Sequence, residues 1–140
     1  MNDIDSYRKQ LTEFSHRAFR GHLVGGTGGN LSLRLPETDT VLITPTGISL
    51  EEVQPEENIL VNLAGDTIDS PQGLKGSKET GFHLAAYSLK PDIGGIAHVH
   101  PPYATAYSNK ARPLPLSTIS AQVNLKHVPY VECFPPGSAE

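Results

Sequence analysis

The stretch that most constrains the fold runs from Ser77 to His100, where a helical pattern is followed by a turn and a short apolar run. His98 and His100 are two residues apart in that run. If the run is a β-strand, both imidazoles lie on one face, because strand side chains alternate with a period of two. Glu79 lies at the start of the preceding helix, and a short helix–turn–strand unit brings it back over that face. We therefore predict a metal site with a carboxylate beside it.

The residue types at this site favour zinc. A catalytic zinc site needs three protein ligands and one open position, and neutral imidazole is a preferred ligand. His98 and His100 supply two ligands, and Glu79 is either a third or the acid/base beside the metal. His83 shares a helix face with Glu79 and is either a ligand, a partner of the ligands or a packed helix residue. His127 is the remaining candidate for a third ligand.

Composition narrows the class of protein. The 140 residues suggest a single domain over 1–140. The formal net charge is −4, and the sequence has no block of Lys and Arg, which argues against a nucleic-acid partner. Apolar runs are too short to span a membrane, and the acidic N-terminus does not resemble a signal peptide. The lone Cys133 fits a reducing cytoplasm.

A glycine-rich run, Gly25–Asn30, precedes an alternating apolar and polar segment that predicts a strand at 31–35. The run does not match the dinucleotide-binding pattern, since no helix follows it, and it lacks the Gly-Lys-Ser/Thr ending of a phosphate-binding loop. Two interpretations remain open. The run is either an anion cradle of backbone N–H groups, with Thr27 and Asn30 as further donors, or a tight turn.

The remaining pattern predicts a helix at 6–21 and strands at 40–44, 58–63, 96–100 and 125–134, with a short strand starting at 67. A second helix is expected from an N-cap at Ser77 to Leu89, and another helix starts near 103. The stripe facing the core of the second helix is expected to consist of Phe82, Ala85, Ala86 and Leu89. Residues 135–140 have the pattern of a loop and a helix N-cap, so a C-terminal truncation is expected.

Four motifs, in the same order and with matching gaps, make the chain resemble the class II aldolase/adducin family. That family contains fuculose-phosphate aldolase, ribulose-phosphate 4-epimerase and the adducin head domain. The motifs are Gly26-Thr27-Gly28-Gly29-Asn30-Leu31-Ser32, Ile43-Thr44-Pro45-Thr46-Gly47, Ser77-Lys78-Glu79 with Ala85-Ala86-Tyr87, and His98-Val99-His100.

The resemblance implies an α/β fold of three layers, α/β/α, with a central and mostly antiparallel sheet. It implies a divalent metal on His98 and His100, usually Zn²⁺ and alternatively Mn²⁺ or Co²⁺, with Glu79 as catalytic acid/base. The family's third metal histidine lies in a downstream segment that this chain does not contain. Lys78 stands where the family often has a serine, and a lysine binds an anion as a point charge. The expected substrate and phosphate ligands are Thr27, Asn30, Thr46, Gly47, Ser77 and Lys78.

The function implied is that of a metal-dependent lyase. It would cleave a C–C bond of a small phosphorylated sugar or sugar acid through a metal-stabilised enediolate. A sugar-phosphate 4-epimerase, a sugar-acid-phosphate decarboxylase or dehydratase, and a non-catalytic adducin-like interaction module are the alternatives. The resemblance also implies a cytoplasmic homotetramer.

Overall fold

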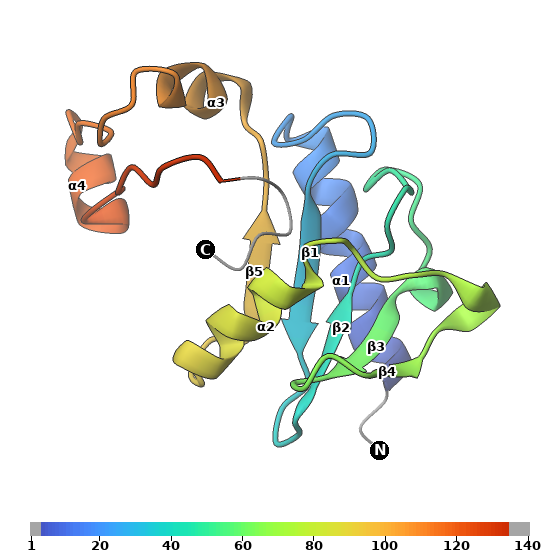
Figure 1. Cartoon of the computed structure of the whole chain (residues 1–140). Coiled ribbons are helices and arrows are strands. Elements are labelled where there is room, and N and C mark those ends of the chain that lie inside the picture. Colours follow the sequence, from blue (N-terminus) through green and yellow to red (C-terminus); the bar gives the residue numbers. More distant parts are fainter. Residues whose placement is uncertain (1–3, 135–140) are drawn as a thin grey trace. The chain divides into compact units, whose positions relative to one another are not determined.

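The computed structural model describes residues 4–134, and its helices and strands are labelled in Figure 1. The chain divides into two compact units, Met1–His100 and Pro101–Glu140, and each is described by itself. That the whole chain forms one domain stays a prediction. The loop and N-cap expected at 135–140 lie outside the described residues.

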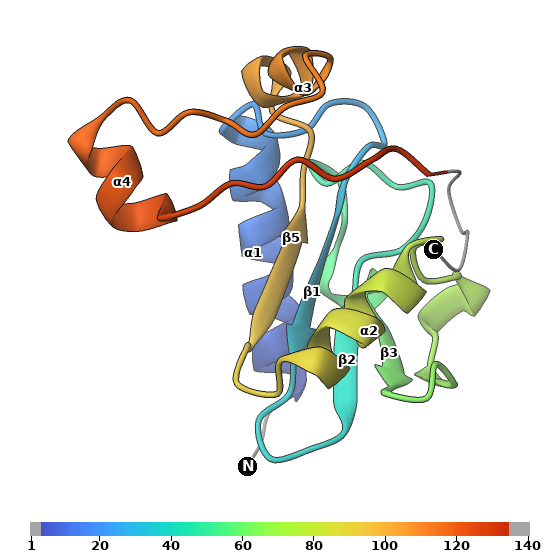
Figure 2. The same ribbon diagram turned by 60° about the vertical axis from the view of Figure 1, so that its left-hand side comes forward.

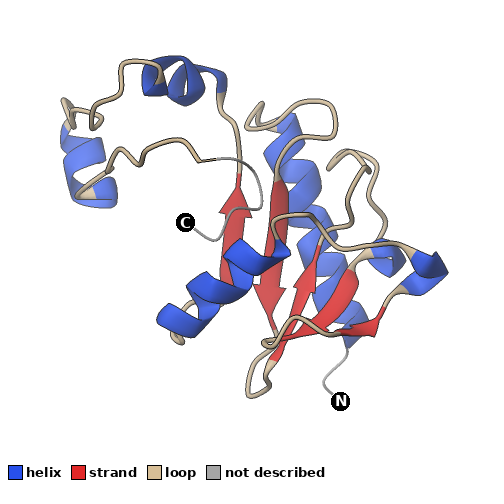
Figure 3. Ribbon diagram, in the orientation of Figure 1, coloured by secondary structure: helices blue, strands red, loops and turns tan. Residues whose placement is uncertain are grey.

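The first unit is built on a five-stranded sheet in which every neighbouring pair of strands is antiparallel (Figure 3). Its strand order is β4-β3-β2-β1-β5. Two single-turn 3₁₀ helices, η1 (Pro55–Glu57) and η2 (Pro71–Gly73), lie in the connections. The strands are β1 (Asn30–Arg34), β2 (Thr40–Ile43), β3 (Ile59–Asn62), β4 (Thr67–Asp69) and β5 (Gly95–His98).

Two helices cover this sheet, one on each face (Figures 1 and 2). The first is α1 (Ile4–Arg20) and the second is α2 (Thr80–Leu89). Because α1, the sheet and α2 follow one another in space, the unit has three layers. The predicted α/β/α architecture with an antiparallel central sheet is confirmed.

Alternation along the strands separates the two halves of the core. Leu31 and Leu42 pack with Leu11 of α1 on one face. Val41 and Ile43 pack with Leu84 of α2 on the other. This alternation is what a sheet buried on both faces requires, because neighbouring residues of a strand point to opposite sides.

The predicted start of α2 and its predicted core-facing stripe are both wrong. The N-cap is Glu79, and Ser77 instead accepts a hydrogen bond from the Glu79 N–H, at 3.2 Å, in the turn before the helix. Phe82 is 60% exposed and Leu89 is 83% exposed. The side that meets the sheet carries His83, Leu84 and Tyr87. Polar residues face the sheet here because two of them hydrogen-bond to polar side chains of β1, as described below.

The second unit contains α3 (Pro102–Ser108) and α4 (Ile119–Leu125). The strand predicted at 125–134 is wrong, since residues 126–134 form neither helix nor strand. Thr118 caps α4 by accepting a hydrogen bond from the Ala121 N–H at 3.1 Å, and Lys126, at φ +56°, ends the helix. Among the described residues, no helix is long and apolar enough to cross a membrane.

Candidate active site

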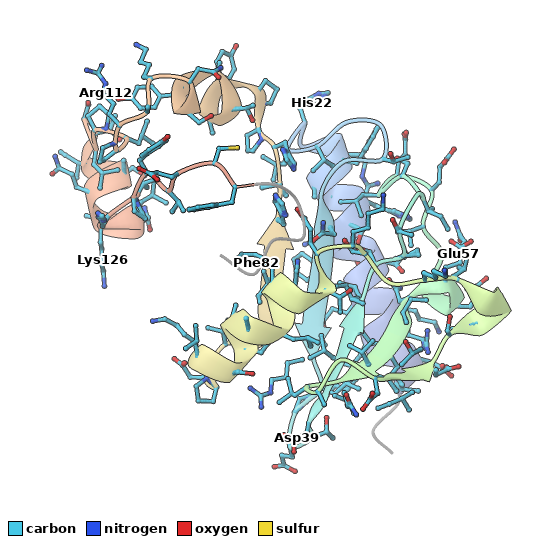
Figure 4. All side chains as sticks on the ribbon, in the orientation of Figure 1. His22, Asp39, Glu57, Phe82, Arg112 and Lys126 are labelled. Carbon is cyan, nitrogen blue, oxygen red and sulfur yellow. The ribbon has the colours of Figure 1, made fainter. Side chains whose placement is uncertain are left out.

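The predicted catalytic residues meet where β1 and β5 lie side by side under the first turn of α2. Asn30 of β1 is paired with His98 of β5 in the antiparallel register. Glu79 precedes α2 directly, so its carboxylate reaches over both strands. Phe82, labelled in Figure 4, extends from the first turn of α2, and its ring centre lies 6.2 Å from that of His98. The helix–turn–strand arrangement predicted from the sequence is therefore present.

The carboxylate of Glu79 lies directly against the imidazole of His98. The contact joins Glu79 Oε2 to His98 Nδ1, and the two side chains are 35% and 29% exposed. The Nδ1 atom itself is buried and has no partner with hydrogen-bond geometry. A buried ring nitrogen that faces a carboxylate without a hydrogen bond is suited to share a cation with it.

The second histidine lies beside the first. The rings of His98 and His100 stack with their centres 4.8 Å apart and their planes 27° from parallel. The two imidazoles thus lie on the same side of the chain, as predicted, although β5 ends at His98 and not at His100 as expected. Across residues 4–134, however, no group of three or more His, Cys, Asp or Glu side chains is arranged to hold a metal. His127 belongs to the second unit, and its role as a ligand stays a prediction.

Opposing influences act on the ionisation of Glu79. Burial raises the pKa of its carboxyl, whereas the Asn30 hydrogen bond and the charges of His98 and His100 lower it. The lowering influences outweigh burial, so the pKa of Glu79 lies below its usual value. Glu79 is therefore an ionised carboxylate at neutral pH, able to accept a proton.

A chain of buried polar side chains continues from Glu79 into the layer between α2 and the sheet. Asn30 Nδ2 donates to Glu79 Oε2 at 2.7 Å. Asn30 Oδ1 lies 2.6 Å from His83 Nε2, and His83 Nδ1 lies 2.6 Å from Ser32 Oγ. Ser32 Oγ in turn lies 2.8 Å from the hydroxyl of Tyr87. Asn30, predicted as a phosphate ligand, is 6% exposed and has both ends of its amide engaged in this chain.

The sequence carries a signal of this network, although the network was not among the predictions. Asn30 and Ser32 are two apart on one face of β1, and His83 and Tyr87 are four apart on one face of α2. Each element is otherwise largely apolar on its core-facing side. Two polar pairs with matching periodicity on neighbouring elements indicate a shared network.

His83 itself is fully buried in this network. Burial and the charge of His98 lower the pKa of His83 to about 4, against a smaller raising influence from Glu79. The ring is therefore neutral at pH 7. His83 is thus a packed helix residue, one of the alternatives that the sequence left open, and its ring meets the Asn30 amide.

Thr46, Gly47, Ser77 and Lys78, four of the residues predicted to bind an anion, lie on two loops that are paired with each other. Pro45 and Gly76 form an antiparallel bridge. The Thr46 N–H donates to Lys75 O at 2.9 Å, and the Ser77 N–H donates to Thr44 O at 3.1 Å. This pairing brings the 44–47 loop beside the segment that leads into Glu79.

The glycine-rich loop approaches β5 closely. Gly29 has φ +75°, and a Cβ atom there would lie 2.8 Å from the carbonyl oxygen of His98 and 2.5 Å from a methyl of Val24. A side chain is therefore excluded at Gly29. Thr27, another predicted anion ligand, is exposed in the same loop.

An apolar groove lies elsewhere, on the α1 face of the sheet. It has a volume of about 440 Å³, and Leu11, Phe14, Leu33 and Ala97 are among the residues that line it. Glu79, His98 and His100 are not among its lining residues. The candidate active site is therefore the open region around Glu79 rather than this groove.

The sequence is similar to those of known proteins. Residues 9–140 match the family model described as the class II aldolase and adducin N-terminal domain. The chain is 34% identical over 132 residues to the L-fuculose phosphate aldolase of Methanococcus vannielii, covering 94% of the chain and 70% of that protein. It is 42% identical over 106 residues to the 3-oxo-tetronate 4-phosphate decarboxylase of Haemophilus influenzae, covering 74% of the chain and 48% of that protein.

A solved structure with the same fold is YgbL from Escherichia coli, whose description leaves its activity open between aldolase, epimerase and decarboxylase. It superposes with a TM-score of 0.86 at 28% sequence identity, covering 97% of this chain and 66% of that chain. The chain spans between about half and about 70% of the length of these relatives.

Proposed function

Since this chain belongs to the class II aldolase and adducin family, we propose that it is a metal-dependent lyase. It would cleave a C–C bond of a small phosphorylated sugar or sugar acid, with Glu79 as the catalytic acid/base. The observation that carries the proposal is the meeting of an ionised carboxylate and a stacked pair of imidazoles at one end of β1 and β5. The names of the aldolase and decarboxylase relatives support the substrate class.

The donor set fits a divalent metal. His98 and His100 would hold it, and Glu79 lies close enough to share it or to act beside it. Two imidazoles and a carboxylate are ligands that Zn²⁺ accepts, with Mn²⁺ and Co²⁺ as alternatives. When bound, such a cation supplies positive charge that stabilises negative charge on substrate oxygens.

Glu79 is suited to begin C–C cleavage as a base. Its carboxylate takes the proton from the hydroxyl of the carbon that becomes the new carbonyl. The electron pair of the broken bond passes to the fragment that already carries a carbonyl, and that fragment later receives a proton from Glu79. Asn30 keeps the carboxylate oxygen pointed toward the strand ends throughout, because its amide donates to Glu79 Oε2.

The anionic end of the substrate would be bound by the paired loops. The backbone N–H groups of Thr46 and Ser77 are already engaged in loop pairing. Their hydroxyls and the exposed ammonium of Lys78 are the groups that would bind a phosphate or carboxylate. Gly47 keeps the turn compact, and Thr27 would add a hydroxyl from the glycine-rich loop. Binding energy at this end would orient the reacting bond.

The test is turnover by the 140-residue chain supplied with Zn²⁺. L-Fuculose 1-phosphate and related sugar phosphates would be offered, and release of the aldehyde product measured. Glu79→Gln keeps an oxygen that accepts the Asn30 hydrogen bond but loses the basic carboxylate. We expect it to retain the fold and to lower kcat by at least about 100-fold. Full activity in Glu79→Gln would contradict the acid/base role.

Decarboxylation is the second candidate, favoured by the 42% identity to a 3-oxo-tetronate 4-phosphate decarboxylase. Loss of CO₂ from a 3-oxo acid leaves an electron pair in the same position as C–C cleavage does, so the same residues serve it. Release of CO₂ from 3-oxo-tetronate 4-phosphate, with no aldehyde formed from sugar phosphates, would identify this reaction. Absence of turnover on either class would leave the non-catalytic interaction module as the better account.

A further inference from the structure

We propose that His83, Ser32 and Tyr87 act as positioning residues: a one-directional chain of hydrogen bonds through them locks the Asn30 amide so that its nitrogen faces Glu79. This inference rests on the proposed function of Glu79. It assigns a role to side chains that do not touch the reacting atoms.

The direction of this series of hydrogen bonds follows from the groups at its two ends. At one end, Asn30 Nδ2 donates to Glu79 Oε2 at 2.7 Å, so the amide nitrogen of Asn30 meets the carboxylate. The amide oxygen then faces His83 Nε2, which must carry a proton to donate. A neutral ring has one N–H, so His83 Nδ1 is an acceptor.

The donors and acceptors of the remaining hydrogen bonds follow in the same way. Ser32 Oγ must donate to His83 Nδ1, and its remaining lone pairs accept from the Tyr87 hydroxyl. Every donor in the series therefore points the same way, from Tyr87 toward Glu79, and the Nε2–H tautomer of His83 is required.

Burial makes this order hard to reverse. His83 and Tyr87 are fully buried, and Ser32 is 3% exposed. Tyr87 belongs to the apolar cluster of the α2 layer, together with Val41, Ile43 and Leu84. Turning the Asn30 amide would oppose its oxygen to the carboxylate and its nitrogen to the donating ring, leaving buried groups unpaired. The neutral state of His83 at pH 7 agrees with its role as donor at one nitrogen and acceptor at the other.

The alternative is that the network merely fills the core. Apolar residues of similar size would fill the same space without the cost of burying polar groups, so packing alone does not require this order. A structural role and a positioning role differ in what happens when one hydroxyl is removed. Only a positioning role predicts that removing the Ser32 hydroxyl lowers the catalytic rate, because Ser32 does not touch the reacting atoms.

The chain offers a matched pair of variants. Ser32→Ala removes the donor to His83, whereas Ser15→Ala removes an equally buried hydroxyl that donates to Leu11 O in α1. Ser32→Thr restores a hydroxyl. We expect Ser32→Ala to lower kcat by about 10- to 100-fold with KM little changed, since a misplaced catalytic group loses rate rather than affinity. Ser15→Ala should leave kcat unchanged, and Ser32→Thr should recover much of the loss.

A second readout does not depend on activity. Nitrogen-15 NMR of the full chain at pH 7 reports the tautomer of His83 directly. We expect the Nε2–H form in the wild-type chain and a mixture with the Nδ1–H form in Ser32→Ala. An Nδ1–H or doubly protonated ring in the wild-type chain would overturn the proposed direction. Equal kcat in Ser32→Ala and Ser15→Ala would overturn the positioning role. If no substrate is turned over, the proposed function fails. The tautomer of His83 still decides the direction of the series of hydrogen bonds.

Discussion

At the scale of single residues, the shifted pKa of His83 makes the stability of the fold depend on pH. Its pKa is lowered to about 4 in the folded chain, against an ordinary value of 6.5. Between these two values the unfolded chain binds the proton and the folded chain does not. The free energy of unfolding therefore falls as the pH falls through this window.

This difference predicts a measurable pH dependence. Between pH 7 and pH 5, His83 should remove about 2 kcal/mol from the free energy of unfolding, as urea titrations would show. The His83→Gln variant should lack this component. An NMR titration of the wild-type ring provides the check that does not depend on a variant. The His83 ring signals should stay constant from pH 8 to pH 5, and a midpoint near 6.5 would contradict the account.

Gly29 carries a second prediction at this scale. Because its φ is positive and a Cβ would meet the His98 carbonyl oxygen at 2.8 Å, Gly29→Ala must shift the glycine-rich loop or β5. We expect a loss of about 1–3 kcal/mol in unfolding free energy.

Gly81→Ala is the matched control, because Gly81 lies in α2 and a Cβ there meets nothing within 4 Å. That change should leave stability equal or raise it by up to about 1 kcal/mol, since alanine favours a helix. A Gly29→Ala variant as stable as wild type in chemical unfolding would show that the close approach is not required.

At the scale of elements, α2 shows where sequence patterning misleads. Phe82, Ala85, Ala86 and Leu89 have helical spacing, yet Phe82 and Leu89 are mostly exposed. The helix is apolar on more than one side, so periodicity alone does not choose the buried face. The choice is made by hydrogen bonds from His83 and Tyr87 to β1, which depend on residues about 50 positions earlier in the chain.

A pair of leucines on α2 tests this orientation. Leu84 is 7% exposed and packs in the core cluster with Tyr87, whereas Leu89 is 83% exposed. Leu84→Ala should lower the free energy of unfolding by about 2–5 kcal/mol. Leu89→Ala should change it by less than about 0.5 kcal/mol. Equal losses for the two variants in urea unfolding would mean that α2 presents its other side to the sheet.

At the scale of the whole molecule, the sequence predicted most of the helices and strands of the first unit. Alternation predicted the strand at β1, the run Thr40–Thr44 predicted the strand at β2, and the two-residue spacing predicted that the rings of His98 and His100 lie on one side. Local patterns of this kind are decided by neighbouring residues. The strand expected at 125–134 is absent, because Leu125 ends α4 and residues 126–134 form neither helix nor strand. The polar pairs on β1 and α2 are visible in the sequence, but which residue of one pair meets which residue of the other depends on the tertiary register between β1 and α2.

The central claim is that His98 and His100 bind one cation beside the carboxylate of Glu79. Equilibrium dialysis of the full chain against Zn²⁺ tests it directly. We predict about one equivalent bound by wild type and by the exposed control His22→Ala, and less than about a tenth of that by His98→Ala. Failure of wild type to bind Zn²⁺, Mn²⁺ or Co²⁺, or binding by His98→Ala equal to that of wild type, would contradict the claim.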